Sequence, residues 1–298
     1  MKLANAALGA AFAGVHTPCM AEPKGNPRIA PTAHFTAQAW VQAGFEHAGY
    51  FDTFQGRVMF NAVKRLTPMA GALGPHVQHH LDYLWIRHAA YEERLRQLQP
   101  DVVVEIGAGL SPRGLSFTRR NPGLIYIEGD LPHMVAAKRR ALAGVELPPN
   151  YHLGTVDLLG SRFLDTLPPV FRAGQKIAAI TEGVTDYLSM DEKRKAMGNI
   201  ASLFRAHGGG RYLFEVHARE LYGAYRQMAR FFTSALGLLV GARFDDRLFE
   251  TIDEARRFAV SCGFDSVEVL ELASLNTTGR HPPLQYCPYR LLEARIGP

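Results

Sequence analysis

The residues best suited to chemistry are acids that lie at the ends of short apolar runs. Val102–Ile106 is typical of a buried parallel strand, and its Glu105 is followed by Gly107 and Gly109. Glycines directly after a strand let the backbone approach a ligand closely. A dinucleotide fingerprint would need a further glycine at position 112, where Pro112 stands. The pattern therefore indicates either a nucleoside site without a complete pyrophosphate cradle or a tight strand-to-helix turn.

The next apolar run ends in two acids, Glu128 and Asp130. Glu128 lies 23 residues beyond Glu105, near the usual offset for a carboxylate that accepts hydrogen bonds from ribose hydroxyls. Because Glu128 and Asp130 are two residues apart, their side chains point the same way in an extended chain. Either acid is a candidate ribose ligand, and Asp130 could also cap the helix that follows it.

Two later runs also end in acids. Asp157 with Leu158 suits an adenine, because the acid can accept from the exocyclic amine while the leucine packs on the ring. Glu182 closes the following run. Carboxylates at four successive strand ends disfavour a polyphosphate and favour a cation that carries hydroxyls and amines. S-adenosylmethionine, with its sulfonium, ammonium and ribose, is the cofactor that this pattern predicts.

The elements that must position these acids alternate between strands and helices. Capping boxes at Ser189–Glu192 and Thr251–Glu254 open two helices, and a long helix is expected over about 219–240. The alternation predicts an α/β fold, a Rossmann-like, seven-stranded, mostly parallel sheet with helices on both faces. Such a sheet binds ligands at the carboxyl ends of its strands, where the strand order reverses. The expected strands are 102–106, 124–127, 151–156, 176–181, 211–216, 266–270 and 288–295.

The first third of the chain has a different pattern. Residues 3–15 are mostly apolar, and we interpret them as an amphipathic helix rather than a secretory signal. Residues 22–31 are rich in proline and suggest an extended linker. Helical periodicity then runs over about 32–99. We therefore expect an N-terminal helix and linker (1–31) and a helical cap (32–99) that forms one compact unit with a cofactor-binding domain at 100–298.

Composition sets wider bounds. The 298 residues carry a formal net charge of +5 that is spread without a basic arm, so no nucleic-acid partner is expected. No apolar stretch reaches the length of a membrane span, so no membrane association is expected. Three cysteines without metal-type spacing suit a reducing compartment, which predicts a cytoplasmic protein. No metal site is expected, since the histidines at 76, 79 and 80 have no obvious carboxylate partner.

Taken together, these motifs resemble the leucine carboxyl methyltransferase family. The similarity is nearest to the bacterial branch that includes the polyketide carboxyl methyltransferase of tetracenomycin synthesis. It covers about residues 85–206, with a weaker match at 31–37. The last helix, strand, loop and strand also resemble the end of class I methyltransferases, where two antiparallel strands form the sheet edge. The segments that carry the family resemblance are Val104–Gly114, Tyr126–Pro132 with Lys138, Asp157–Leu158 and Thr181–Leu188.

The resemblance implies a methyltransferase that uses S-adenosylmethionine. In it Arg87 would bind the methionine carboxylate, Glu182 would face the methionyl side, and Asp130 would hold the ribose. The chain departs from the family pattern at Ser111-Pro112 and at Thr185-Asp186. From the strand ends and the resemblance together, the candidate cofactor residues are Arg87, Glu105, Gly107, Gly109, Glu128, Asp130, Asp157, Leu158 and Glu182.

The methyl acceptor depends on the catalytic groups. A carboxylate is ionised at neutral pH and needs no base, whereas a phenol or alcohol needs one, such as histidine. His217, just past the fifth strand, is the best-placed histidine, with Tyr187 and Asp186 as the next candidates. No Asp–His pair is visible at the strand ends, so we expect a methyl ester on a small-molecule carboxylate. Methylation of a hydroxyl and a non-catalytic nucleoside-binding protein are the alternatives.

Overall fold

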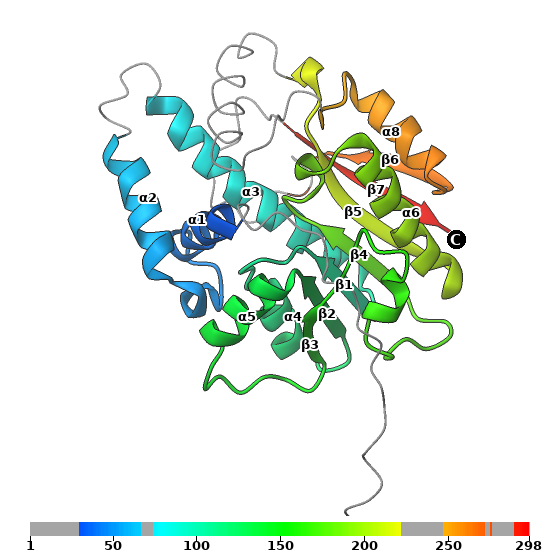
Figure 1. Cartoon of the computed structure of the whole chain (residues 1–298), viewed down its shortest axis with the longest axis horizontal. Helices are drawn as coiled ribbons and strands as arrows, with labels where there is room; N and C mark the ends of the chain where they lie inside the picture. The colour runs from blue at the N-terminus through cyan, green and yellow to red at the C-terminus, as the bar shows by residue number, and fades with distance from the viewer. Residues whose placement is uncertain (1–29, 67–73, 222–246, 272–274, 276–288, 298) are drawn as a thin grey trace, which may run out of the picture.

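A seven-stranded sheet crosses the molecule, with helices packed on both of its faces (Figure 1). The computed structural model describes residues 30–66, 74–221, 247–271, 275 and 289–297. The strand order is β3-β2-β1-β4-β5-β7-β6, so the order reverses between β1 and β4, as the sequence predicted. The strands are β1 (Val102–Ile106), β2 (Ile125–Asp130), β3 (Tyr151–Thr155), β4 (Ile177–Thr181), β5 (Gly210–Val216), β6 (Ser266–Leu270) and β7 (Arg290–Ile296).

Strands β1 to β5 run parallel, and β7 lies antiparallel to both β5 and β6. This confirms the α/β fold and the antiparallel edge pair. The second strand is longer than expected at its carboxyl end, because Gly129 and Asp130 pair with Gly154 and Thr155 of β3. Asp130 is therefore held within the sheet rather than in the following loop.

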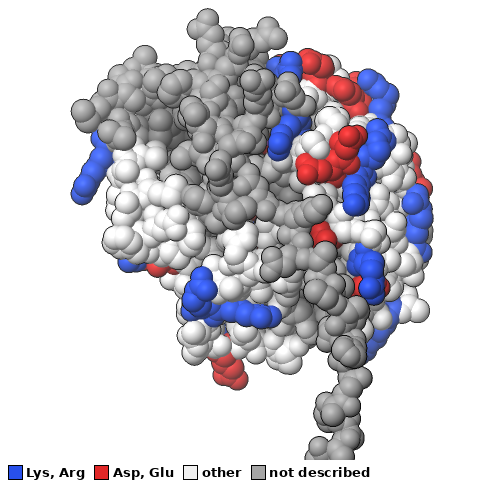
Figure 2. All heavy atoms as spheres, in the orientation of Figure 1, with Lys and Arg blue, Asp and Glu red and all other residues white. Residues whose placement is uncertain are grey.

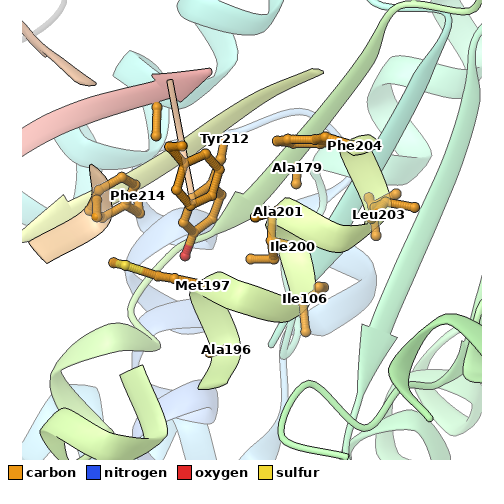
Figure 3. Close-up of a cluster of buried hydrophobic side chains, with 14 of the residues drawn as sticks. Ile106, Ala179, Ala196, Met197, Ile200, Ala201, Leu203, Phe204, Tyr212 and Phe214 are labelled. Atoms are coloured by element: carbon orange, nitrogen blue, oxygen red, sulfur yellow. The ribbon is translucent and has the colours of Figure 1, made fainter. Parts of the chain in front are cut away.

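Helices cover the two faces with different side chains. On one face α3 (Gly74–Leu98) packs Tyr91 and Leu95 against the sheet. On the other face α6 (Met190–Ala206) and α8 (Ile252–Ser261) cover a second apolar cluster. Figure 3 shows Met197, Ile200 and Phe204 of α6 beside sheet residues of that cluster. Along the β2 and β3 edge lie α4 (Arg113–Arg120) and α5 (Pro132–Ala141).

The region expected to be a helical cap contains α1 (Ala30–Gln42), the short η2 (Ala48–Phe51), α2 (Phe54–Leu66) and α3. The expected linker over 22–31 is wrong at its end, because Pro31 already lies in the first turn of α1, where its missing N–H is tolerated. The N-terminal helix expected before residue 20 lies outside the described residues. So does the helix expected over 219–240 beyond Leu221.

One of the two expected capping boxes is complete. In the first, Glu192 N donates to Ser189 Oγ at 3.3 Å and Ser189 N donates to Glu192 Oε2 at 2.8 Å. In the second, Glu254 N donates to Thr251 Oγ1 at 3.1 Å. The carboxylate of Glu254 instead accepts from Glu250 N at 2.7 Å, one residue before the N-cap, so this prediction is only half right.

The distribution of surface charge and the apolar character of the helices bear on possible partners. On the face shown in Figure 2, Lys and Arg are interspersed with Asp and Glu among the described residues. Across the described ranges, no helix has both the length and the apolar character needed to cross a bilayer.

Candidate functional site

The turn between β1 and α4 contacts residues at the end of β2 and directly after β4. Gly107 has φ +72° and Gly109 has φ +52°, backbone conformations that glycine adopts at little cost. Gly107 N donates to Gly129 O at 2.8 Å, and Gly109 N donates to Asp130 Oδ2 at 2.6 Å. A Cβ atom at position 107 would lie 2.3 Å from Val184 Cγ2, after β4. The turn is thus fixed between the ends of β2 and β4.

Two half-buried acids lie at the neighbouring strand ends. Asp130 also accepts from Leu131 N at 2.7 Å. Burial raises the pKa of Asp130, and the two backbone N–H donors offset only part of that effect. Asp157 follows β3, and its Oδ1 accepts from Leu159 N at 3.2 Å, with the side chain of Leu158 mostly buried beside it. Each carboxylate has lone pairs beyond those used by the backbone, so both can accept hydrogen bonds from hydroxyl or amine groups.

Arg87 and Glu182 meet at the end of β4. Arg87 Nε donates to Glu182 Oε1 at 3.0 Å, and its Nη1 donates to Tyr83 Oη at 2.9 Å. Gly183, with φ +68°, lets the backbone pass close to the guanidinium, since a Cβ there would lie 3.2 Å from Arg87 Nη2. Arg87 thus places a cation at the strand ends, where the resemblance predicts that the methionine carboxylate binds.

A buried charge network lies beneath this pair. Arg113 donates to Glu182 and, at 2.7 Å, to Glu105 Oε1, while Tyr126 Oη donates to Glu105 Oε2 at 2.5 Å. Burial by itself raises the pKa of Glu182, but its electrostatic interactions with Arg113, His88 and Arg87 outweigh that effect, and the pKa lies well below its ordinary value. Glu182 is therefore an anion that orients both arginines.

Removal of Arg113 tests this network. Arg113→Met leaves the Glu105 and Glu182 carboxylates buried without their shared cation, and we expect the free energy of unfolding to fall by about 3–5 kcal/mol. Urea denaturation measures it. Arg120→Met is the matched control, because Arg120 lies on the same helix and pairs with Glu46 at the surface, where a pair contributes about 0–1 kcal/mol. Equal losses in both variants would contradict the role of Arg113.

Two of the expected cofactor acids, Glu105 and Glu128, lie behind the strand ends. Glu105 is 1% exposed and Glu128 is 0% exposed, so neither presents an oxygen at the protein surface. Glu128 pairs with Lys138, accepts from Tyr151 Oη at 2.6 Å and accepts from Gly114 N at 3.2 Å. Although Glu128 shares a strand face with Asp130, helices α4 and α5 cover it. Its contacts join those helices to β2, and a ribose contact does not fit this position.

The acceptor-side candidates form a contact that sequence reasoning missed. His217 Nδ1 lies 2.5 Å from Asp186 Oδ2, and His217 Nε2 lies 3.2 Å from Tyr83 Oη. The Asp186 and His217 side chains are 21% and 15% exposed, so both are partly accessible. Burial raises the pKa of Asp186, but its electrostatic interaction with His217 outweighs that effect, and the pKa is lowered overall.

The expectation that the strand ends hold no Asp–His pair is therefore wrong. Asp186 and His217 are 31 residues apart in sequence, and they meet because β4 and β5 are neighbours in the sheet. Tyr187, the third candidate, follows Asp186 in the same turn. Its Oη is 3.4 Å from Thr32 Oγ1 of α1, so it contacts the helical cap.

The strand order, the antiparallel edge pair and the glycine turn at the switch point define a class I methyltransferase fold. Residues 42–201, more than half of the 298, match the leucine carboxyl methyltransferase family. The chain therefore belongs to this family of S-adenosylmethionine-dependent methyltransferases, which confirms the resemblance found in the sequence. No curated protein matches the chain.

One solved structure with a TM-score above 0.5 has the same fold. An O-methyltransferase family protein from Burkholderia thailandensis is 15% identical with a TM-score of 0.52, covering 91% of this chain and 72% of that one. Mitomycin 7-O-methyltransferase MmcR is 15% identical, with a TM-score of 0.48 and coverage of 92% and 74%. PigF with SAH is 16% identical, with a TM-score of 0.46 and coverage of 66% and 50%. The chain thus spans only half the length of PigF.

Proposed function

We propose that the chain binds S-adenosylmethionine at the carboxyl ends of β1 to β4 and transfers its methyl group to an oxygen of a small molecule. The observation that carries the proposal is the Gly107–Gly109 turn, fixed between Asp130 and Val184 in a member of a methyltransferase family. When bound, the cofactor supplies an electrophilic methyl group on a sulfonium. The chain contributes alignment of the acceptor, which accounts for much of the acceleration in such transfers.

The described residues fit the parts of this cofactor. Arg87 offers a guanidinium to the methionine carboxylate, and Glu182 holds that guanidinium from behind. Gly107 and Gly109 leave room beside the methionine. The residues assigned to the nucleoside are Asp130 for the ribose and Asp157 with Leu158 for the adenine.

Asp157→Ala tests the adenine assignment. Loss of a hydrogen bond to a charged group should weaken S-adenosylmethionine binding by about 1.5–3 kcal/mol, which is roughly a 10- to 100-fold rise in Kd. Titration calorimetry measures it. Asp165→Ala, which removes an exposed acid that pairs only with Arg162 among the described contacts, should leave Kd unchanged. If the two variants bind equally well, Asp157 does not contact the adenine.

Family membership supports a carboxylate acceptor and a methyl ester product. An ionised carboxylate needs no base, so the transfer would depend on alignment alone. For this acceptor we expect the rate to be nearly flat across neutral and mildly alkaline pH, since no proton is removed in the transition state.

The Asp186–His217 contact favours a second acceptor, a phenol or alcohol, and the geometry supports it better. His217 Nε2 would take the hydroxyl proton in place of its 3.2 Å contact with Tyr83 Oη, and the Asp186 carboxylate, 2.5 Å from Nδ1, would stabilise the imidazolium that forms. This contact also removes one of the two arguments for an ester, the one that relied on the lack of such a pair, and leaves family membership as the other. We therefore propose hydroxyl methylation, with His217 as the general base and Asp186 as its partner.

A screen of hydroxybenzoic acids tests the proposed function, because each molecule carries both a carboxylate and a phenol. Product mass shows whether a methyl group is transferred, and alkaline hydrolysis distinguishes an ester from an ether. We expect a methyl ether that survives alkali. An alkali-labile product would establish the carboxylate acceptor instead, and S-adenosylmethionine binding without transfer to any acceptor would favour a binding protein.

A further inference from the structure

The short helix η5 (Thr185–Tyr187) carries two of the three acceptor-side candidates. Its own hydrogen bonds are few. Tyr187 N donates to Val184 O and Leu188 N donates to Thr185 O, each at 3.1 Å. A single turn of this kind has little intrinsic stability. The position of Asp186 therefore depends on what holds the turn from outside.

Two cationic side chains hold the carbonyl groups at the end of that turn. Lys193, on α6, donates from Nζ to Leu188 O at 3.0 Å, and Arg247 donates from its guanidinium to Tyr187 O. Lys193 Nζ also donates to Arg247 O at 2.5 Å, which links the two. We call Lys193, Arg247 and the two carbonyls they bind the turn clamp.

The turn clamp connects to the other half of the Asp186–His217 pair. Arg247 lies two residues before Phe249, which bridges to Ala218 directly after His217. Arg219 N donates to Phe249 O at 2.9 Å, and Glu220 N donates to Glu250 O at 3.1 Å. Residues 247–250 therefore contact both the Asp186 turn and the segment that carries His217.

If the side chain at position 193 served only to fill space, a lysine would be energetically unfavourable there. Its side chain is 2% exposed, and burial of an ammonium is unfavourable. The charged groups that act on it are Asp186 of η5, Arg247 and Glu192 of its own helix, and its Nζ lies 5.7 Å from the centre of the Phe249 ring. Burial chiefly lowers the pKa of Lys193 to about 8, with Arg247 acting in the same direction against the two acids.

We propose that Lys193 is a positioning residue that holds Asp186 against His217 by clamping the carbonyl end of the η5 turn. The inference rests on the proposed function, because its consequence is for proton transfer by His217. It predicts that Lys193 affects the chemical step and leaves the cofactor contacts at β1 to β3 unchanged. It also predicts that the charge of Lys193 matters as well as its size.

The test compares Lys193→Met, Lys193→Arg and Lys195→Met, the last being an exposed lysine on the same helix. The first readout is hydrogen exchange of the Tyr187 and Leu188 amides in the ligand-free chain. The second is kcat with hydroxybenzoic acids, alongside the Kd of S-adenosylmethionine. For Lys193→Met we expect faster exchange and a kcat lower by about 10- to 100-fold, as for a small misplacement of reacting groups. Kd should stay within about twofold, since a misplaced turn acts on the chemical step.

Lys193→Arg and the pH profile exclude a merely structural role. Arginine keeps the charge and the donors, so it should restore slow exchange and most of kcat. In the wild type kcat should fall as pH rises through about 8, because the ammonium loses its proton there. Lys193→Arg should lack that fall, and Lys195→Met should match the wild type in every readout. If Lys193→Met does not fold, Lys193→Gln replaces it.

Three outcomes would overturn the proposal. They are unchanged exchange and kcat in Lys193→Met, equal losses in Lys193→Met and Lys193→Arg, and an alkaline fall that persists in Lys193→Arg. Failure of the proposed function gives a different result, namely a wild type that binds no S-adenosylmethionine. The exchange readout needs neither cofactor nor acceptor, so it still tests the turn clamp in that case.

Discussion

Gly107→Val should strongly weaken S-adenosylmethionine binding. At φ +72° a β-branched residue is strained, and its Cβ would lie 2.3 Å from Val184 Cγ2. The turn must move, and it then leaves the hydrogen bonds that fix it to β2. We expect the Kd from titration calorimetry to rise by roughly 100-fold or more, which corresponds to about 2.7 kcal/mol.

Gly123→Ala is the control for this variant, because a Cβ at position 123 meets nothing within 4 Å. It should bind like the wild type. Circular dichroism establishes that both variants fold. Binding by a folded Gly107→Val at near wild-type affinity would show that the cofactor does not use this turn.

His217→Ala should lower kcat for a hydroxyl acceptor by about 10²–10⁴-fold, the usual contribution of a general base. The base must be unprotonated to accept a proton, so wild-type activity should rise as the pH rises. The variant should lose that rising limb along with its activity. The measurement is the pH profile of methyl transfer to hydroxybenzoic acids for both proteins.

His133→Ala is the matched control, since His133 is exposed on α5. It should keep both the rate and the rising limb. A wild-type profile that is flat across neutral pH, with His217→Ala as active as the wild type, would contradict the base. That result would favour a carboxylate acceptor and a methyl ester product instead.

The fold was predictable because each of its signals is local. Short apolar runs closed by acids or glycines mark strands that are buried on both faces, and α6 and α8 each begin with a capping side chain. The Ser189–Glu192 box and strand β1 are found where expected. The prediction of a second box at Thr251–Glu254 was half right, because the Glu254 carboxylate accepts from Glu250 N instead of from the N-cap N–H. Sequence spacing does not determine which of two adjacent N–H groups a side chain binds.

The site was less predictable because depth and partners are tertiary properties. Alternation in β2 placed Glu128 and Asp130 on one face correctly, but it could not show that α4 and α5 cover Glu128. The Asp186–His217 pair also lacks a local signal, because its members follow different strands. The strand order could have suggested it, since the residues after β4 and β5 lie side by side in this fold.

Binding of S-adenosylmethionine to the wild-type chain is the most direct test of the central claim. Titration calorimetry should give a saturable isotherm with one site per chain, and Asp157→Ala should shift it to weaker affinity. A wild-type chain that is folded by circular dichroism and yet shows no saturable binding would contradict the assignment of the strand-end residues to this cofactor.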